Sequence, residues 1–144
     1  LLEQFSQFIN SNLPMRQVTI RDESMTGELL NELILQVEAE TISVETLIKT
    51  RVEKEVTTYN EQLPEYFNGL VQPLEAERLL NGYRLKNRRP IDAEKQCYIA
   101  LDAFQKNGFF VLVDDYQVSD LKEEILVDET TKVSFVRLTP LVGG

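Results

Sequence analysis

The first third of the chain alternates apolar and polar residues in the manner of strands. Val18 and Ile20 alternate with polar neighbours, which is the period of a strand with one buried face. We therefore predict a first strand over residues 16–23. A turn that contains Gly27 follows, and a second alternating run over residues 29–38 completes a predicted hairpin.

Residues 43–59 carry apolar side chains at the spacing of an amphipathic helix. Thr41 and Ser43 are both candidate N-caps, because a hydroxyl oxygen can accept a hydrogen bond from a free amide of the first turn. The pattern predicts a long helix whose apolar stripe faces the hairpin. The stripe consists of Val44, Leu47, Ile48, Val52 and Val56.

Prolines and glycines interrupt the segment 60–108, which has no strand-like alternation. This composition predicts an inserted helical subregion. Residues 74–80 are predicted to form one or two helical turns. Asp92 is predicted to cap a longer helix that ends near Gly108. The apolar side chains assigned to that helix are Tyr98, Ile99, Leu101 and Phe104.

The last third of the chain returns to strand patterns. Residues 109–113 form a continuous apolar run, which is typical of a strand buried on both faces. A very short strand is predicted over residues 116–118, and residues 125–127 are candidates for a buried loop. Alternation over residues 132–138 predicts the last strand.

The order of these elements predicts an α+β domain. A hairpin, a long helix and three later strands are typical of the β-grasp arrangement, a mixed sheet packed on one helix, in which the first and last strands are parallel central neighbours. The helical insertion would lie between the long helix and the third strand. We expect this domain to span residues 15–144, with residues 1–14 as an N-terminal extension or a cloning remnant.

Composition and charge favour a folded protein that meets other proteins. Hydrophobic residues make up 42% of the 144, which is enough to bury a core. The formal net charge of −9 would repel nucleic-acid phosphates and anionic membranes. No apolar run approaches the roughly 18 residues that a membrane span needs. We expect a cytoplasmic protein with protein partners.

The available side chains argue against an enzyme or a metal site. The chain has no histidine, so it lacks His-dependent triads and the commonest metal ligand. Cys97 is the single cysteine, and we interpret it as an inert buried thiol. Asp114 and Asp115 follow a buried strand and are predicted to form a turn without a catalytic role. No glycine-rich phosphate loop has the required spacing.

Three stretches of the sequence carry a family likeness. Residues 16–27 match a first strand and its glycine-bearing turn, and residues 110–120, FVLVDDYQVSD, match a middle strand followed by a short one. Residues 133–144, VSFVRLTPLVGG, match a last strand and a di-glycine ending. Together they resemble ubiquitin-like proteins and the sulfur carriers of thiamin and molybdopterin synthesis, which share the β-grasp fold. The inserted segment 60–108 departs from that family.

The resemblance implies that the terminal Gly143-Gly144, at the end of the C-terminal tail (residues 138–144), is the working part of the protein. A partner activating enzyme would use ATP to adenylate Gly144, which would then be conjugated to amines on target proteins. Gly143 has no side chain and would fit a narrow passage of that enzyme. The same passage would recognise the side chains of Leu141 and Val142. The chain itself would need no cofactor. The alternatives are a sulfur carrier with a C-terminal thiocarboxylate, a non-conjugated β-grasp interaction module, and a merely frayed chain end.

Two further candidate binding surfaces follow from the sequence. An apolar patch beside the tail docks partners in the ubiquitin-like family, and the matching positions are Met25, Leu112 and Leu138. Alternatively, both leucines face the core. A basic cluster would bind a phosphate or an acidic partner surface, or form a solvated loop. The cluster consists of Arg84, Lys86, Arg88 and Arg89.

Overall fold

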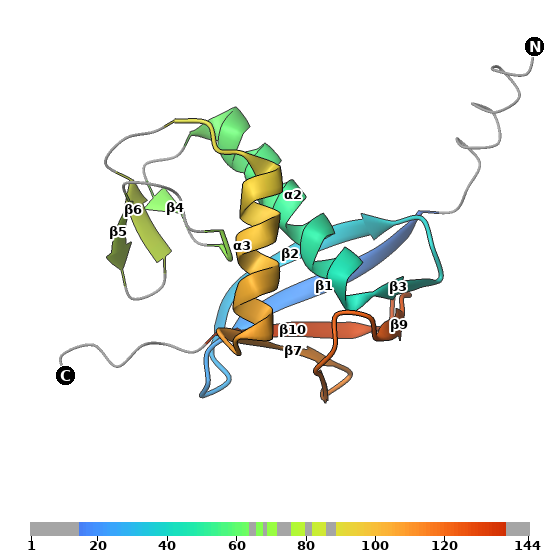
Figure 1. Ribbon diagram of the computed structural model, residues 1–144. Helices are drawn as coiled ribbons and strands as arrows, with labels where there is room; N and C mark the ends of the chain where they lie inside the picture. Colours follow the sequence, from blue (N-terminus) through green and yellow to red (C-terminus); the bar gives the residue numbers. More distant parts are fainter. Residues whose placement is uncertain are drawn as a thin grey trace, which may run out of the picture.

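The computed structural model has a mixed five-stranded sheet with two helices on one face, an α+β architecture (Figure 1). This statement covers the described part of the chain. The structure describes residues 15–63, 66–67, 69–71, 76–79, 82–85 and 89–137. The predictions for residues 1–14 and for the C-terminal tail lie outside those ranges.

The prediction of a parallel central pair is confirmed by the sheet topology. The spatial order is β2 (Leu29–Val37), β1 (Arg16–Glu23), β10 (Lys132–Arg137), β7 (Phe109–Val113) and β8 (Tyr116–Val118). Strands β1 and β10 are parallel, with Ile20 opposite Val133, and the other pairs are antiparallel. The first strand and the last described strand therefore lie side by side in the middle of the sheet.

One face of the sheet is covered by helix α2 (Val44–Gln62). The buried phase of β1 contains Val18 and Ile20, and that of β10 contains Val133 and Phe135. Because side chains alternate between the two faces of a strand, this inner face joins the apolar stripe of α2 in one core. The predicted stripe of α2 is buried at all five positions.

Helix α2 begins after Ser43, which decides between the two candidate caps. The Ser43 Oγ atom accepts a hydrogen bond from the Thr46 amide at 3.1 Å. Thr41 instead lies in the short strand β3 (Thr41–Ser43), which pairs with β9 (Glu124–Leu126). The predicted buried loop is thus a strand, with Ile125 buried and Leu126 exposed.

The prediction of a helical insertion is wrong for its first half. Three short strands form a second sheet in the order β4-β6-β5, and residues 76–79 are a strand where helical turns were predicted. The strands are β4 (Tyr66–Phe67), β5 (Ala76–Leu79) and β6 (Gly82–Leu85). Strands β5 and β6 pair antiparallel, with Leu79 opposite Gly82. The Asn81-Gly82 dipeptide is a typical sequence signal for a hairpin, and sequence reasoning missed it.

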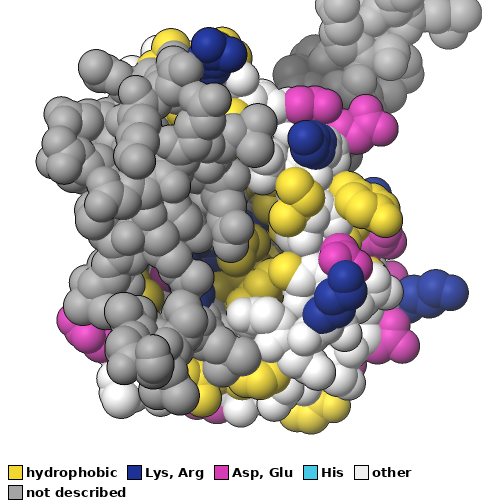
Figure 2. Space-filling model, turned by 60° about the vertical axis from the view of Figure 1, so that its left-hand side comes forward, with side chains coloured by type: hydrophobic (Ala, Val, Ile, Leu, Met, Phe, Trp, Pro, Cys, Tyr) yellow, Lys and Arg dark blue, Asp and Glu magenta, His cyan; other side chains and the backbone are white. Residues whose placement is uncertain are grey.

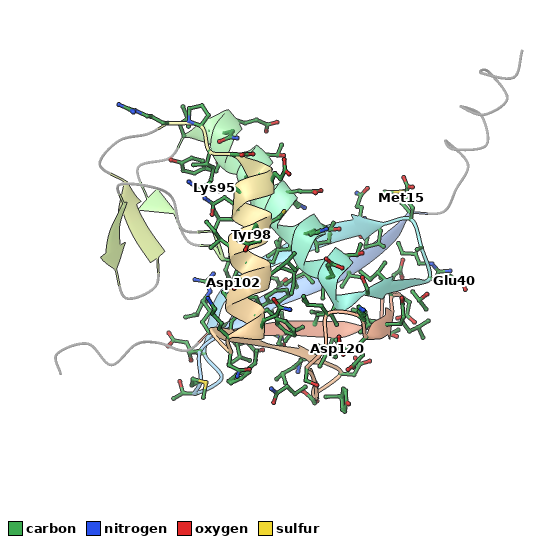
Figure 3. All side chains as sticks on the ribbon, viewed as in Figure 1. Met15, Glu40, Lys95, Tyr98, Asp102 and Asp120 are labelled. Atoms are coloured by element: carbon green, nitrogen blue, oxygen red, sulfur yellow. The ribbon has the colours of Figure 1, made fainter. Side chains whose placement is uncertain are left out.

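The second half of the insertion contains the predicted helix, α3 (Ala93–Gln105), although its orientation differs from the prediction. Asp92 caps it by accepting a hydrogen bond from the Glu94 amide at 3.1 Å. Tyr98 is 74% exposed and Ile99 is 42% exposed, and Figure 3 shows Tyr98 on the outward side of α3. The buried side chains of α3 are Gln96, Cys97, Ala100 and Phe104. This face brings α3 into contact with α2, where the Cys97 thiol donates to the Lys49 carbonyl oxygen at 3.8 Å.

Candidate functional site

The outer face of the sheet, opposite α2, carries a small apolar patch over β7 and β10. Val136 lies opposite Phe110, and Ser134 lies opposite Leu112. Phe110, Leu112 and Val136 are partly buried, so β7 is not buried on both faces as predicted. Both described helices lie on the other side of the sheet. We call Phe110, Leu112 and Val136 the outer patch.

Polar side chains border the outer patch on its two sides. Arg21 lies opposite Ser134 from β1, and Gln117 lies opposite Leu112 from β8. Glu23 is the β1 neighbour of Val136. An apolar centre with a polar border is a typical composition for a contact surface between proteins.

The structure places only part of the sequence-predicted patch. Leu112 lies on the outer face, because it alternates with the buried Val111. Met25 is 59% exposed in the turn between β1 and β2, at the end of the sheet where β10 also ends. Leu138 lies outside the described residues, as do Leu141, Val142, Gly143 and Gly144. Sequence reasoning missed Phe110 and Val136, since the register that places them beside Leu112 depends on strand pairing.

The basic cluster is described at two of its four positions. The backbone of Arg84 lies in β6 opposite Tyr66 and Glu77, and Arg89 is exposed. Lys86 and Arg88 lie outside the described residues.

Asp114 and Asp115 form the predicted turn, with φ angles of 49° and 68°. No group of three or more metal-ligating side chains occurs in the part of the chain that the structure describes.

A buried charge network lies under the end of β10, and sequence reasoning did not find it. The Arg51 guanidinium donates to both carboxylate oxygens of Asp22, with Nη2 to Oδ2 at 2.5 Å. Arg51 Nη2 also donates to Glu55 Oε1 at 2.8 Å. Arg137 Nη2 donates to Asp22 Oδ2 at 3.1 Å. We call Asp22, Arg51, Glu55 and Arg137 the buried charge network.

The electrostatics of the network are balanced because two acids face two bases. Asp22 and Arg51 are fully buried, and Glu55 is 7% exposed. Burial lowers the pKa of Arg51, but the Glu55 charge and the hydrogen bonds and charge of Asp22 outweigh it, so that pKa lies above its ordinary value. The Arg51 guanidinium also lies 4.4 Å from the centroid of the Phe135 ring, a favourable cation–π contact.

Two side chains of α2 hold the insertion. Glu55 accepts hydrogen bonds from the amides of Leu70 and Val71, with both Oε2 contacts at 3.0 Å. Asn60 makes a reciprocal pair with Ile91: Nδ2 donates to its carbonyl at 3.0 Å and Oδ1 accepts from its amide at 2.8 Å. The insertion is therefore joined to α2 at two places, residues 70–71 and Ile91.

A sequence signal for the network does exist. Asp22 continues the buried phase of Val18 and Ile20, and Arg51 and Glu55 fall within the apolar stripe of the helix. Charged residues in buried phases usually require partners, so these positions predict a buried ion pair. Which residues pair follows only from the packing of α2 on β1.

The described surface in the view of Figure 2 mixes side chains of several kinds. In Figure 2, hydrophobic, acidic and basic side chains lie next to one another on the part that is not grey. No helix in the described part of the chain is long and apolar enough to cross a membrane.

Comparisons with known proteins give no relative for this chain. No family model matches it, and neither a search of curated proteins nor a search of solved structures finds a match.

Proposed function

We propose that this chain is a ubiquitin-like protein modifier with a β-grasp fold, joined to amines of target proteins through Gly144. The parallel pairing of β1 with β10 at the centre of the sheet carries this proposal. In a β-grasp domain that pair holds the strand that leads to the reactive end of the chain. Here residues 138–144, LTPLVGG, directly follow β10.

The chemistry explains why the sequence after β10 matters. A carboxylate is a poor acyl donor, so a partner enzyme would activate Gly144 as an adenylate with ATP. Glycines suit a narrow passage to the ATP, because they have no Cβ and allow close backbone approach. Pro140 removes one backbone donor, which disfavours continuation of the sheet into the tail.

The outer patch supports the proposal, because it offers partners an apolar contact surface on β10, the strand that leads to the tail. Val136 stands one residue before the end of β10, and its cross-strand neighbour Phe110 extends the apolar surface onto β7. A partner that binds the tail would lie close to this surface, because Val136 is next to the last residue of β10. Leu112 continues the patch, and Met25 lies exposed at the same end of the sheet.

Mass spectrometry of the protein from its source cells tests the proposal. A modifier leaves a branched Gly-Gly remnant on lysines of target proteins after proteolysis. A sulfur carrier instead carries sulfur in place of oxygen on Gly144. An unmodified Gly144 carboxylate would contradict both the modifier and the sulfur-carrier function. The intact mass would show whether the mature chain ends at Gly144.

Deletion of Gly144 gives the matched genetic test. We expect the deletion to abolish conjugation and leave the thermal unfolding midpoint unchanged, because a chain end buries little area. Thr139→Ser is the control, since it alters the tail without changing its length or its end. Conjugates that persist without Gly144 would refute the role of the tail.

A further inference from the structure

A continuous chain of polar contacts joins the insertion to the end of β10. It runs from the amides of Leu70 and Val71 to Glu55, then through Arg51 and Asp22 to Arg137. Each distance in that path lies between 2.5 and 3.0 Å except the last, which is 3.1 Å. Arg137 is the last residue of β10, so the path ends where the C-terminal tail begins.

Burial makes this path more than a set of surface contacts. Val71 is 3% exposed and belongs to the hydrophobic core, and Leu70 packs against it. In a low-dielectric interior, the two buried carboxylates and the Arg51 guanidinium hold one another in a single arrangement. A change at one member therefore alters the electrostatic environment of the others.

Glu55 joins the Arg51 guanidinium to two backbone amides of the insertion. One of its oxygens accepts from Arg51, while the carboxylate as a whole accepts from two amides of the insertion. An apolar residue of similar size would fill the space, but it would leave both amides and the guanidinium without this acceptor.

We propose that Glu55 is a positioning residue that fixes the insertion relative to the base of the C-terminal tail, so that a protein partner acting on the tail contacts the insertion as well. The part that concerns the partner rests on the proposed function. The part that concerns the coupling rests on the contacts alone. The insertion then belongs to the recognition surface for the activating enzyme.

Amide hydrogen exchange, measured by NMR, tests the coupling without a partner. In Glu55→Gln, an NH₂ group replaces one carboxylate oxygen, so a hydrogen-bond donor faces the Arg51 guanidinium or the amides of Leu70 and Val71, which are donors themselves. We expect exchange at Leu70 and Val71 to rise about tenfold, the usual effect of losing one buried charge-assisted hydrogen bond. Arg137 and Asp22 should show chemical-shift changes. Glu53→Gln, an exposed change on the same helix, is the control and should leave all four residues unaffected.

Arg137→Gln probes the path from its other end and keeps the test valid if Glu55→Gln folds poorly. Arg137 is 19% exposed, so its replacement strains the core less. We expect faster exchange at Leu70 and Val71 in this variant too, and a double variant less perturbed than the sum of the single ones. If Arg137→Gln leaves the amide exchange rates of Leu70 and Val71 unchanged, the proposed coupling is wrong.

A conjugation assay tests the contribution to the partner. Tagged variants are expressed in source cells at equal levels, and high-mass conjugates are compared. We expect at least about a fivefold loss of conjugates in Glu55→Gln relative to Glu53→Gln, within the range of typical coupling free energies. If deletion of Gly144 removes the conjugates but Glu55→Gln does not reduce them, the recognition role of the insertion is wrong and the modifier proposal stands. If the deletion leaves them intact, the proposed function itself fails.

Discussion

At the scale of single residues, the turn between β7 and β8 has a local conformation that its side chains do not prefer. Asp114 and Asp115 both have positive φ, the geometry of a two-residue hairpin turn. Asp114 has a reason to be there, because its Oδ1 accepts a hydrogen bond from the Lys132 amide at 2.9 Å. Asp115 makes an exposed ion pair with Lys132 at 3.7 Å, which contributes little.

Asp115→Gly is therefore expected to stabilise the protein. Glycine adopts positive φ without a steric penalty, and we expect a gain of about 0.5 to 1 kcal/mol in the free energy of unfolding. Urea unfolding at pH 7 measures it. Asp114→Gly serves as the contrast, since it also removes the bond to Lys132 and should gain less or lose stability. Equal gains from both variants would contradict this account of the turn.

Cys97 shows how burial controls the reactivity of a single side chain. It is 7% exposed, and its Sγ contacts the Lys49 carbonyl oxygen at 3.8 Å. Burial, followed by the charge of Glu53, raises the pKa of the thiol above its ordinary value. The folded state therefore holds the proton more tightly, and this contribution to stability is present below the unfolded pKa and is lost as pH rises through the folded one.

We expect alkylation of Cys97 by iodoacetamide at pH 8 to be at least about 100-fold slower in the folded protein than in 8 M urea, because the thiolate is the nucleophile and the site is closed. Mass spectrometry of quenched samples gives both rates. Similar rates in the two states would mean that α3 does not stay packed on α2.

At the scale of elements, α2 has three roles in the fold: it covers the sheet, it packs against α3, and it holds the insertion at residues 70–71 and at Ile91. Its beginning depends on Ser43, whose Oγ accepts from the Thr46 amide. The sequence left Thr41 and Ser43 as equal candidates. The pairing of Thr41 with Leu126 removes Thr41 from the helix start.

Ser43→Ala should consequently lower the free energy of unfolding by about 1 kcal/mol, the usual cost of losing an N-cap. Thr41→Ala is the control, because Thr41 is an exposed residue of β3, and its effect should stay within about 0.5 kcal/mol. Thermal unfolding followed by circular dichroism compares the two. A larger loss from Thr41→Ala would place the start of the helix elsewhere.

The long elements and the three-residue strand β8 were predicted, and the other short strands were not. The limits of β1 agree with the prediction, and α2 extends only a few residues beyond it, because their periodic patterns run over many residues. Strands β5 and β6 have four residues each, too few for a period to emerge, and a hairpin signal was the only available cue. The orientation of α3 was mistaken since Tyr98 and Ile99 are apolar yet exposed.

At the scale of the whole molecule, the buried charge network links the main sheet, α2 and the insertion. Asp22 comes from β1, Arg51 and Glu55 from α2, and Arg137 from β10. Arg51 neutralises two carboxylates at once, so it is the member whose loss leaves the most charge uncompensated.

Arg51→Met is expected to lower the free energy of unfolding by about 3 to 5 kcal/mol at pH 7, because it keeps much of the volume but removes the base that the two buried carboxylates share, so that Glu55 loses its guanidinium partner while Asp22 keeps Arg137. Urea unfolding measures the loss. The triple variant Asp22→Asn, Arg51→Met, Glu55→Gln should recover part of it by removing the uncompensated charges. A triple variant less stable than Arg51→Met would show that packing, not charge, dominates at this site.

The sequence by itself determined the elements whose information is local and periodic: β1, β2, α2, β10, the helix cap at Asp92 and the turn at Asp114 and Asp115. It also predicted the parallel pairing of β1 with β10, since a hairpin followed by one long helix leaves few ways to complete a sheet. Tertiary structure decided which face Leu112 and Val136 occupy, because strand facing depends on register. It alone brought together Asp22, Arg51 and Arg137, whose positions differ by up to 115 residues along the chain. Local patterns cannot encode contacts between residues so far apart, and only the packing of α2 across β1 and β10 creates them.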